Sequence, residues 1–282
     1  MTPTALVTGC SSGIGLSTAV LLAEAGYRVV ATLRDLPRDA PLKARADSRG
    51  VSLHVRELDV ASRESIATCV NGMLADFGSI DLLVNNAGFG MLGSLEQLSP
   101  EVLTRVMDTN FFGVCHTTRA VLPSMRERGS GRIITVTSVG GLLGQPFNDA
   151  YCAAKFAVEG LMESLAPVAR QFGIHVSLVE PGPVHSAFVD SARARSGATL
   201  SSDVPGYAEL LSRYAAAVQG VFAEHGQTPD DVGRLIVEIA RSPSPHLRYP
   251  TSPYARGLVA RKYVDPSGDS IVELFASRLR GS

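Results

Sequence analysis

Apolar residues along the chain gather in short, often β-branched runs that alternate with stretches of helical periodicity. The apolar runs predict buried strands, and the periodic stretches predict helices, one of which is broken near Asn110. The expected strands cover 4–9, 27–34, 51–60, 80–88, 131–138 and 173–182, and the expected helices cover 13–26, 62–78, 100–128, 148–172 and 228–241. This alternation predicts an α/β protein with a doubly wound parallel sheet and helices on both of its faces.

The remaining segments are polar or irregular. Residues 35–50 indicate a polar connection, and residues 186–222 predict helices between Ser/Gly-rich joints, inserted before the last sheet element. Residues 245–282 begin with a turn-rich stretch and continue as a somewhat basic C-terminal extension with apolar patches. We expect a single domain over 1–282, with the ligand cleft at the carboxyl ends of the strands.

Composition excludes several classes of protein. A net charge of −1 argues against a nucleic-acid partner held by its phosphates. No basic segment precedes an apolar run at the N-terminus, and no apolar run reaches the roughly 18 residues of a membrane span, so we expect a cytoplasmic protein. The four cysteines form no CxxC pair and the six histidines show no ligand spacing, which predicts reduced thiols and no metal site.

A glycine-rich loop, TGCSSGIG, stands between the first expected strand and helix. Its glycines, Gly9, Gly13 and Gly15, follow a GxxxGxG order and not the familiar GxGxxG order. Glycines here allow a tight turn, close approach of backbone to a pyrophosphate, and close packing of helix on sheet. The helix N-terminus would then face the phosphates, so the loop, with Ser11, Ser12 and Ile14, is predicted to bind a dinucleotide.

The end of the second strand favours NADP(H) over NAD(H). Enzymes that use NAD usually place an acid there for the ribose diol, whereas this strand ends in Arg34. A guanidinium can hold a 2′-phosphate through two charge-assisted hydrogen bonds, although a solvated surface arginine is also common. Asp59, which with Val60 closes the third strand, is a candidate acceptor for the adenine amino group.

Several motifs now occur together: TGCSSGIG, NNAG, Asn110, Ser138, a Tyr-x-x-x-Lys pair at Tyr151 and Lys155, and Pro181-Gly182. In order and spacing they resemble the classical short-chain dehydrogenases/reductases over roughly residues 4–190. ATLRDL, GPVHSAF, LRY and DPSG extend the similarity to members that convert steroids and retinoids. The resemblance implies a Rossmann-type fold, an NADP(H)-dependent enzyme acting on a lipophilic alcohol or ketone, and a homodimer or homotetramer paired through residues 100–128 and 150–172.

The resemblance assigns the proton transfer to Tyr151. A free tyrosine has a pKa of about 10, but an ammonium about 4 Å away favours the phenolate by roughly 4 kcal/mol at an effective dielectric of about 20. Lys155, one helical turn away, is expected to supply that charge and to bind the nicotinamide ribose. The resemblance makes Ser138 a donor to the reacting oxygen and makes Asn110 the holder of a water that links Lys155 to solvent.

Further residues are implied at the cofactor and the substrate. For the cofactor these are Asn86, Ala87, Gly88, Pro181, Gly182, Val184 and Ser186, where many relatives have Thr at the last position. His185 between them is expected to be packed or solvated. For the substrate we expect a mostly apolar pocket formed by Leu92, Glu96, Val139, Leu143, Phe147, Asn148 and Phe188, although Val139 and Phe147 could equally be core residues.

One departure weakens an estradiol-like substrate. Estradiol-converting members hold the far hydroxyl with a histidine in the excursion, and a rough alignment places Ala217 there, with His225 nearby. Two other readings stay open: a cofactor-binding regulator with the same fold and no turnover, and a membrane-surface protein that uses its amphipathic tail. A solvated extension is the simpler interpretation of the tail.

Overall fold

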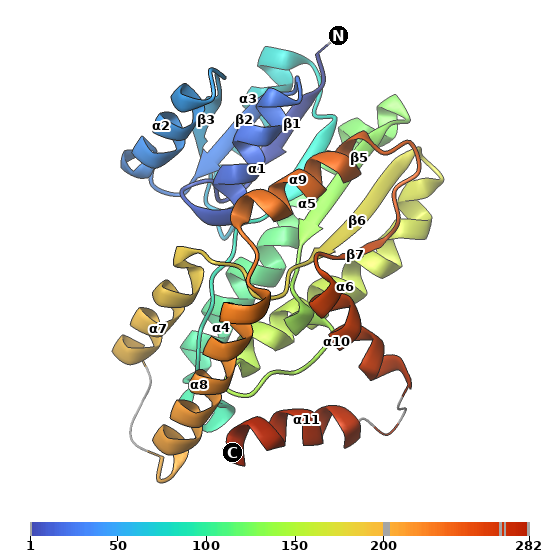
Figure 1. Cartoon of the computed structure of the whole chain (residues 1–282). Helices are drawn as coiled ribbons and strands as arrows, with labels where there is room; N and C mark the ends of the chain where they lie inside the picture. Colours follow the sequence, from blue (N-terminus) through green and yellow to red (C-terminus); the bar gives the residue numbers. More distant parts are fainter. Residues whose placement is uncertain (1, 200–203, 265–266, 268, 281–282) are drawn as a thin grey trace.

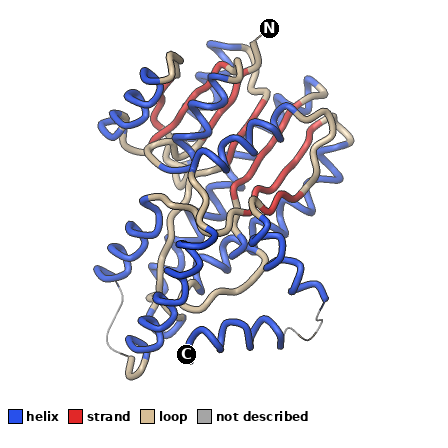
Figure 2. The backbone as a smooth tube through the Cα atoms, viewed as in Figure 1, coloured by secondary structure: helices blue, strands red, loops and turns tan. Residues whose placement is uncertain are grey.

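The computed structural model describes residues 2–199, 204–264, 267 and 269–280. Within them the strands, red in Figure 2, form one parallel sheet in the order β3-β2-β1-β4-β5-β6-β7. The strands are β1 Thr4–Val7, β2 Arg28–Leu33, β3 His54–Glu57, β4 Leu82–Asn85, β5 Gly131–Val136, β6 Ile174–Glu180 and β7 Arg248–Pro250. The strand order reverses between β1 and β4, the position where doubly wound sheets open a ligand crevice.

Helices cover both faces of the sheet, as the sequence predicts. Two apolar clusters fill the two sides: one contains α1 Gly13–Glu24 and α9 Pro229–Arg241, and the other contains α3 Arg63–Phe77, α5 Gly113–Arg128 and α6 Asp149–Arg170. Buried β-branched and leucine side chains of alternate strand positions face the two clusters, with Val7 on one side and Leu6 on the other. This explains why the strands read as continuous apolar runs.

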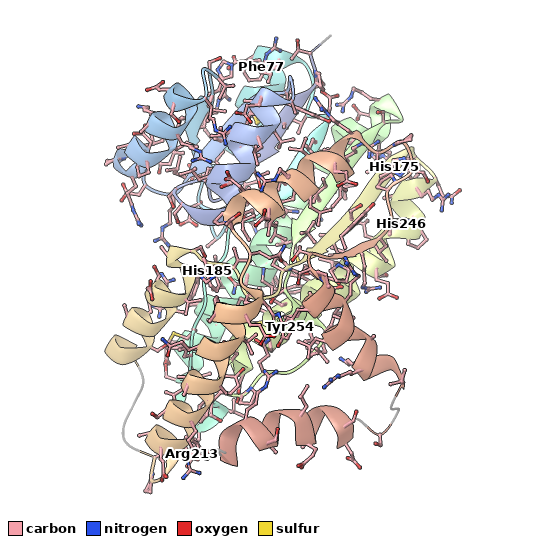
Figure 3. All side chains as sticks on the ribbon, viewed as in Figure 1. Phe77, His175, His185, Arg213, His246 and Tyr254 are labelled. Carbon is pink, nitrogen blue, oxygen red and sulfur yellow. The ribbon has the colours of Figure 1, made fainter. Side chains whose placement is uncertain are left out.

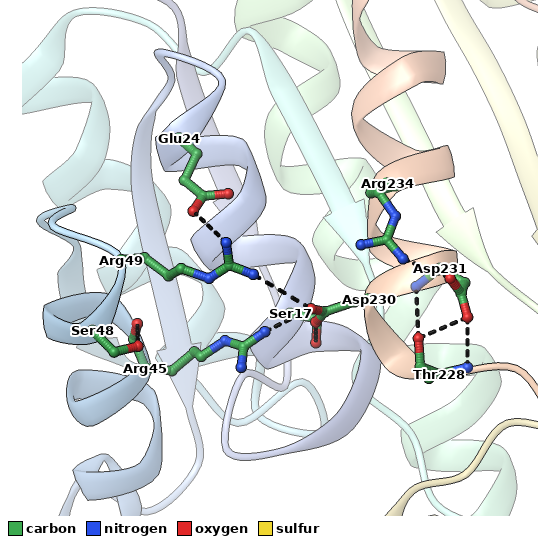
Figure 4. Close-up of polar contacts among 9 residues, drawn as sticks. All are labelled: Ser17, Glu24, Arg45, Ser48, Arg49, Thr228, Asp230, Asp231 and Arg234. Atoms are coloured by element: carbon green, nitrogen blue, oxygen red, sulfur yellow. Dashed lines mark hydrogen bonds and ion pairs between the residues drawn. The ribbon is translucent and has the colours of Figure 1, made fainter.

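Polar contacts fix α9 against the first part of the chain. Asp230 accepts hydrogen bonds from the Ser17 hydroxyl at 2.7 Å and from Arg45 at 2.6 Å (Figure 4). The side chain of Thr228 caps α9 by accepting from the Asp231 amide, while the Asp231 carboxylate accepts from the Thr228 amide at 2.8 Å. This reciprocal cap stabilises the start of α9 beside α1.

The predicted break near Asn110 is confirmed. Helix α4 Pro100–Met107 passes into a π-helical turn, Asp108–Phe112, before α5 begins. Single π turns of this kind often occur at functional sites because they reorient a few side chains within an otherwise regular helix.

The predicted excursion and extension are both helical. Helices α7 Ala187–Thr199 and α8 Tyr207–His225 form the excursion, and α10 Pro253–Val264 and α11 Asp269–Arg280 form the extension. In Figure 1 these four helices lie beyond the end of the sheet opposite the N-terminus, which is where the strands have their carboxyl ends. Helix α8 continues three residues past the predicted limit of 222.

One prediction about the fold is wrong. Residues 35–50 are not simply a polar connection, because they contain a 3-10 turn, Leu36–Arg38, and helix α2 Ala40–Ser48. Only Leu42 and Ala46 of α2 are buried, too few to give a visible helical period. The last sheet element, which the sequence analysis places after the excursion without bounds, is β7 in the described residues; it is three residues long and lies inside the turn-rich stretch, where no apolar run signals it.

Candidate active site

A cavity of about 700 Å³ opens at the carboxyl ends of the strands. Every residue predicted to hold the cofactor lines it: Gly9, Ser11, Ser12, Gly13, Ile14, Gly15, Arg34, Asp59, Val60, Asn86, Ala87, Gly88, Tyr151, Lys155, Pro181, Gly182, Val184 and Ser186. These residues follow β1, β2, β3, β4 and β6 or lie on α6, so the sheet topology itself brings them together.

The glycine loop is fastened to the end of β4. The Thr8 hydroxyl accepts hydrogen bonds from the amides of Asn86 and Ala87 at 2.9 and 3.0 Å, and the Asn86 side chain donates to the Thr8 and Gly9 carbonyls. A Cβ on Gly15 would lie 2.3 Å from both the Gly9 oxygen and the Asn86 Nδ2. Glycine is therefore required at this position by the close approach of two backbone segments.

The geometry of this loop fits a dinucleotide. Gly9 and Gly13 have φ of 73° and 59°, values that suit glycine, and Gly13 begins α1. The side chain of Ser12, at the N-cap position, makes no capping hydrogen bond, so the first N–H groups of α1 are left for a ligand. A helix N-terminus with free N–H groups in a glycine-rich turn is suited to bind a pyrophosphate.

Tyr151, Lys155 and Ser138 meet on the wall of the same cavity. The Lys155 Nζ lies 5.8 Å from the centroid of the Tyr151 ring and donates a 2.8 Å hydrogen bond to the Val136 carbonyl. The Ser138 hydroxyl accepts from the Gly140 amide at 3.0 Å, and its side chain lies close enough to Tyr151 to affect the pKa of the Tyr151 hydroxyl. The tyrosine and the lysine thus share one face of α6, as their spacing predicts.

The pKa values differ from the simple electrostatic expectation. Burial raises the pKa of the Tyr151 hydroxyl above its usual value, and the hydrogen bond with Ser138 opposes that rise. Burial also lowers the pKa of Lys155 to about 8, while the negative charge of Glu159 opposes the fall. Desolvation, which the sequence did not reveal, therefore acts against the expected acidification of Tyr151.

Asn110 lies behind this wall and not on it. Its side chain is fully buried, accepts from the Phe89 amide at 2.9 Å and donates to the Phe89 carbonyl at 2.8 Å. A Cβ on Gly88 would lie 3.1 Å from the Asn110 Oδ1 and 3.9 Å from the Lys155 Nζ. From the π-helical turn, Asn110 therefore holds the segment after β4 close to Lys155.

Sequence reasoning missed a buried acidic group behind Lys155. Glu159 accepts hydrogen bonds from the Thr137 hydroxyl at 2.6 Å and from Arg248 Nε at 3.0 Å. Glu180 is fully buried and lies 3.4 Å from Arg248 Nε. Burial and the charge of Glu159 raise the pKa of Glu180 to about 8, and Arg248 opposes the rise. Helical spacing from Lys155 was the signal that could have identified Glu159.

The predicted substrate residues divide into two groups. Leu92, Val139, Asn148 and Phe188 line the cavity, whereas Glu96, Leu143 and Phe147 lie outside its lining. Leu143 and Phe147 belong to an apolar cluster that packs behind the wall, and Glu96 accepts a 3.1 Å hydrogen bond from the Tyr207 hydroxyl. Phe147 is buried, so it is a core residue, which was the alternative expectation for this position.

The helical excursion and the extension supply much of the remaining wall, which the sequence did not predict residue by residue. The lining includes Leu211, Tyr214, Val218, Phe222, Tyr254, Leu258 and Arg278. His185 packs edge-on against Phe222 at 5.8 Å, and His225 stacks on Tyr254 at 4.5 Å; Figure 3 labels His185 and Tyr254. Ala217 and His225 are not part of the lining, so no histidine of the excursion reaches the cavity in the described residues.

Comparison with known proteins agrees with this geometry. The short chain dehydrogenase family matches residues 3–197. The chain is 44% identical over 275 residues to retinol dehydrogenase 8 of Bos taurus, covering 95% of this chain and 88% of that protein. It is 42% identical over 275 residues to human 17-beta-hydroxysteroid dehydrogenase type 1, covering 95% and 83%.

Solved structures give the same answer. A short chain dehydrogenase/reductase from Burkholderia phymatum, in complex with NAD, aligns with a TM-score of 0.80 and 27% identity, covering 94% of each chain. Another similar structure is that of a metagenomic short-chain oxidoreductase in complex with NADP. The chain belongs to the short-chain dehydrogenase family. Within that family it is an NAD(P)-dependent alcohol dehydrogenase or ketone reductase.

Proposed function

We propose that this protein interconverts a lipophilic alcohol and its ketone or aldehyde with NADP(H), using Tyr151 as general acid and base. The observation that carries the proposal is that Tyr151, Ser138 and the glycine loop line one continuous cavity whose remaining wall is largely apolar. An apolar pocket with few convergent polar groups favours a lipophilic substrate.

The chain's own residues account for orientation and proton transfer. When bound, the nicotinamide supplies or accepts the hydride. The hydroxyls of Ser138 and Tyr151 hold the reacting oxygen, and Tyr151 gives it a proton during reduction or takes one during oxidation. Lys155, held by the Val136 carbonyl, places a positive charge beside the Tyr151 ring and favours loss of the tyrosine proton. Asn110 holds the backbone of Phe89, and with it the segment after β4, beside Lys155.

Preference for NADP(H) rests on Arg34. Arg34 lines the cavity directly after β2, at the position where an enzyme that uses NAD usually has the acid that binds the ribose. A guanidinium attracts the 2′-phosphate with charge-assisted hydrogen bonds. Asp59 and Val60, at the end of the third strand region, are assigned to the adenine.

The relatives named for retinol and for 17-beta-hydroxysteroids support a substrate of steroid-like or retinoid-like size and polarity. The absence of an excursion histidine from the described lining argues against a hydroxyl held as in estradiol-converting relatives. We therefore assign the class of substrate and not one molecule. The lining residues assigned to it are Leu92, Val139, Asn148 and Phe188.

A panel of lipophilic ketones, aldehydes and alcohols, tested with NADPH, NADH, NADP and NAD, examines the whole proposal. We expect turnover with NADPH or NADP to exceed turnover with the unphosphorylated cofactors. Arg34→Ala should reduce the affinity for NADPH more than that for NADH. Equal losses would remove the cofactor assignment, and cofactor binding without any turnover across the panel would favour the regulator with the same fold.

Oligomerisation and location complete the proposal. We propose a homodimer or homotetramer paired through α5 and α6, because Phe112, Phe156, Val168 and Phe172 on or beside these helices are large, apolar and exposed. Light scattering after size-exclusion chromatography would test this oligomeric state.

We propose a cytoplasmic location, supported by four free thiols. Among the described helices, none has the length and apolar character needed to cross a bilayer.

A further inference from the structure

Four arginines line the cavity at the end that faces the assigned cofactor phosphate: Arg34 and Arg38 after β2, Arg105 on α4 and Arg195 on α7. Burial, followed by the positive charges of the other three arginines, lowers the pKa of Arg195. Arg195 is thus close enough to the other three arginines to be repelled by them. Asp35 also lines the cavity, which leaves a net charge of +3 on these five side chains.

The position of Arg195 is set by contacts of α7 with the segment after β4. The guanidinium lies 5.2 Å from the centroid of the Phe89 ring, and the Leu92 amide donates a 2.8 Å hydrogen bond to Ser196 on the same helix. Helix α7 packs so closely here that a Cβ on Gly90 would lie 2.9 Å from two of its side chains. Arg195 is therefore held at the cavity by packing and does not simply extend into solvent.

We propose that Arg105 and Arg195 form the outer half of a binding site for the 2′-phosphate on the adenosine ribose, opposite Arg34 and Arg38. This inference rests on the proposed use of NADP(H). A phosphate dianion offers three oxygens to planar guanidinium forks. Arg34 and Arg38 would contact the phosphate from one side only. Arg105 on α4 and Arg195 on α7 would contact it from the other side.

The same helix connects this phosphate site to the substrate wall. Phe188, near the start of α7, packs edge-on against the Tyr151 ring at 5.8 Å. A phosphate held by Arg195 therefore stabilises the helix that carries Phe188 beside the reacting group. NADPH should thus lower the KM for the ketone relative to NADH at saturating cofactor, and Arg195→Gln should reduce that difference.

Binding of two nucleotide fragments tests the proposal without turnover. Adenosine 2′,5′-bisphosphate carries the 2′-phosphate and adenosine 5′-monophosphate lacks it. Isothermal titration should show that the wild type prefers the bisphosphate, and that Arg105→Gln and Arg195→Gln each weaken it about tenfold, or about 1.4 kcal/mol, with the monophosphate changed less than about twofold. Arg119→Gln, at an exposed arginine of α5 outside the lining, is the control and should bind both as the wild type does.

The outcomes separate this inference from the proposed function. If the wild type binds both fragments equally, the preference for NADP(H) and this inference both fail. If the wild type prefers the bisphosphate and only Arg34→Gln abolishes the preference, the cofactor assignment stands and the outer half of the site is wrong. Equal losses in Arg119→Gln and Arg195→Gln would show an unspecific charge effect and would also overturn the inference.

Discussion

The Thr137 hydroxyl donates a 2.6 Å hydrogen bond to Oε1 of Glu159, which joins the end of β5 to the middle of α6. Thr137 stands between two residues of the site: the carbonyl of Val136 accepts from Lys155, and the side chain of Ser138 lies beside Tyr151. One buried contact therefore fixes the strand end that carries the serine relative to the helix that carries the tyrosine and the lysine.

Glu159→Gln should shift the pH dependence of ketone reduction. The amide retains an oxygen for Thr137 but loses the negative charge that opposes the low pKa of Lys155. In the wild type the rate should fall as pH rises through about 8, where Lys155 loses its proton. In the variant this fall should move to lower pH by on the order of one unit.

Steady-state rates at saturating cofactor between pH 6 and 10 would measure the shift. Glu163→Gln is the matched control, because Glu163 also pairs with Arg248 but its side chain is exposed to 60%. A profile of Glu159→Gln that coincides with those of the wild type and Glu163→Gln would show that Glu159 does not set the charge on Lys155.

Glu180→Gln should stabilise the protein, and more strongly as pH rises. Burial raises the pKa of Glu180 in the folded protein to about 8, from an ordinary value of 4.5. The folded state therefore binds more protons than the unfolded state between these pH values, and the wild-type free energy of unfolding falls as pH rises through this window. An amide does not titrate, so the variant avoids a loss on the order of 4 kcal/mol by about pH 8.

Urea unfolding at pH 5, 7 and 9 would measure this difference, with the exposed Glu127→Gln as control. We expect the difference in free energy of unfolding between the variant and the wild type to increase from pH 5 to pH 8 and then to level off. A gap that stays constant with pH would mean that Glu180 is ionised throughout, paired with Arg248 despite its burial.

Tyr151→Phe should reduce turnover by several orders of magnitude, because it removes the hydroxyl that exchanges a proton with the substrate. Affinity for NADPH, measured by isothermal titration calorimetry, should change little, since the ring that remains still fills the wall. Tyr27→Phe removes a hydroxyl that is bonded to the Ala240 carbonyl, away from the cavity lining, and should leave turnover unchanged. Near wild-type rates in Tyr151→Phe would remove the assigned role.

The sequence predicted the inner part of the site because each of its residues lies close to a strand end or on one helix. The carboxyl ends of parallel strands meet at one edge, so the order of strands along the chain was enough to bring Gly9, Asn86, Ser138 and Pro181 together. The Tyr151 and Lys155 pair needed only the helical repeat.

The sequence could not reveal contacts between distant segments. Arg248 pairs with Glu159 across 89 residues, and it stands in a three-residue strand without an apolar signal. Arg195 approaches Phe89 only because α7 folds back over the cavity. The raised pKa of Tyr151 depends on desolvation, which is a property of the packed wall and not of the motif.

Gly15→Ala should abolish dinucleotide binding and lower stability. The added Cβ would lie 2.3 Å from the Gly9 oxygen and from the Asn86 Nδ2, so the loop or the end of β4 must move, at a cost of about 1–3 kcal/mol. Gly220→Ala offers a matched control in α8, where a Cβ would meet nothing within 4 Å and alanine should add about 0.5–1 kcal/mol of stability. Thermal unfolding with and without NADPH measures both effects: the wild type and Gly220→Ala should gain stability from the cofactor, and Gly15→Ala should not. A normal shift with NADPH in Gly15→Ala would contradict the assignment of this loop to the pyrophosphate.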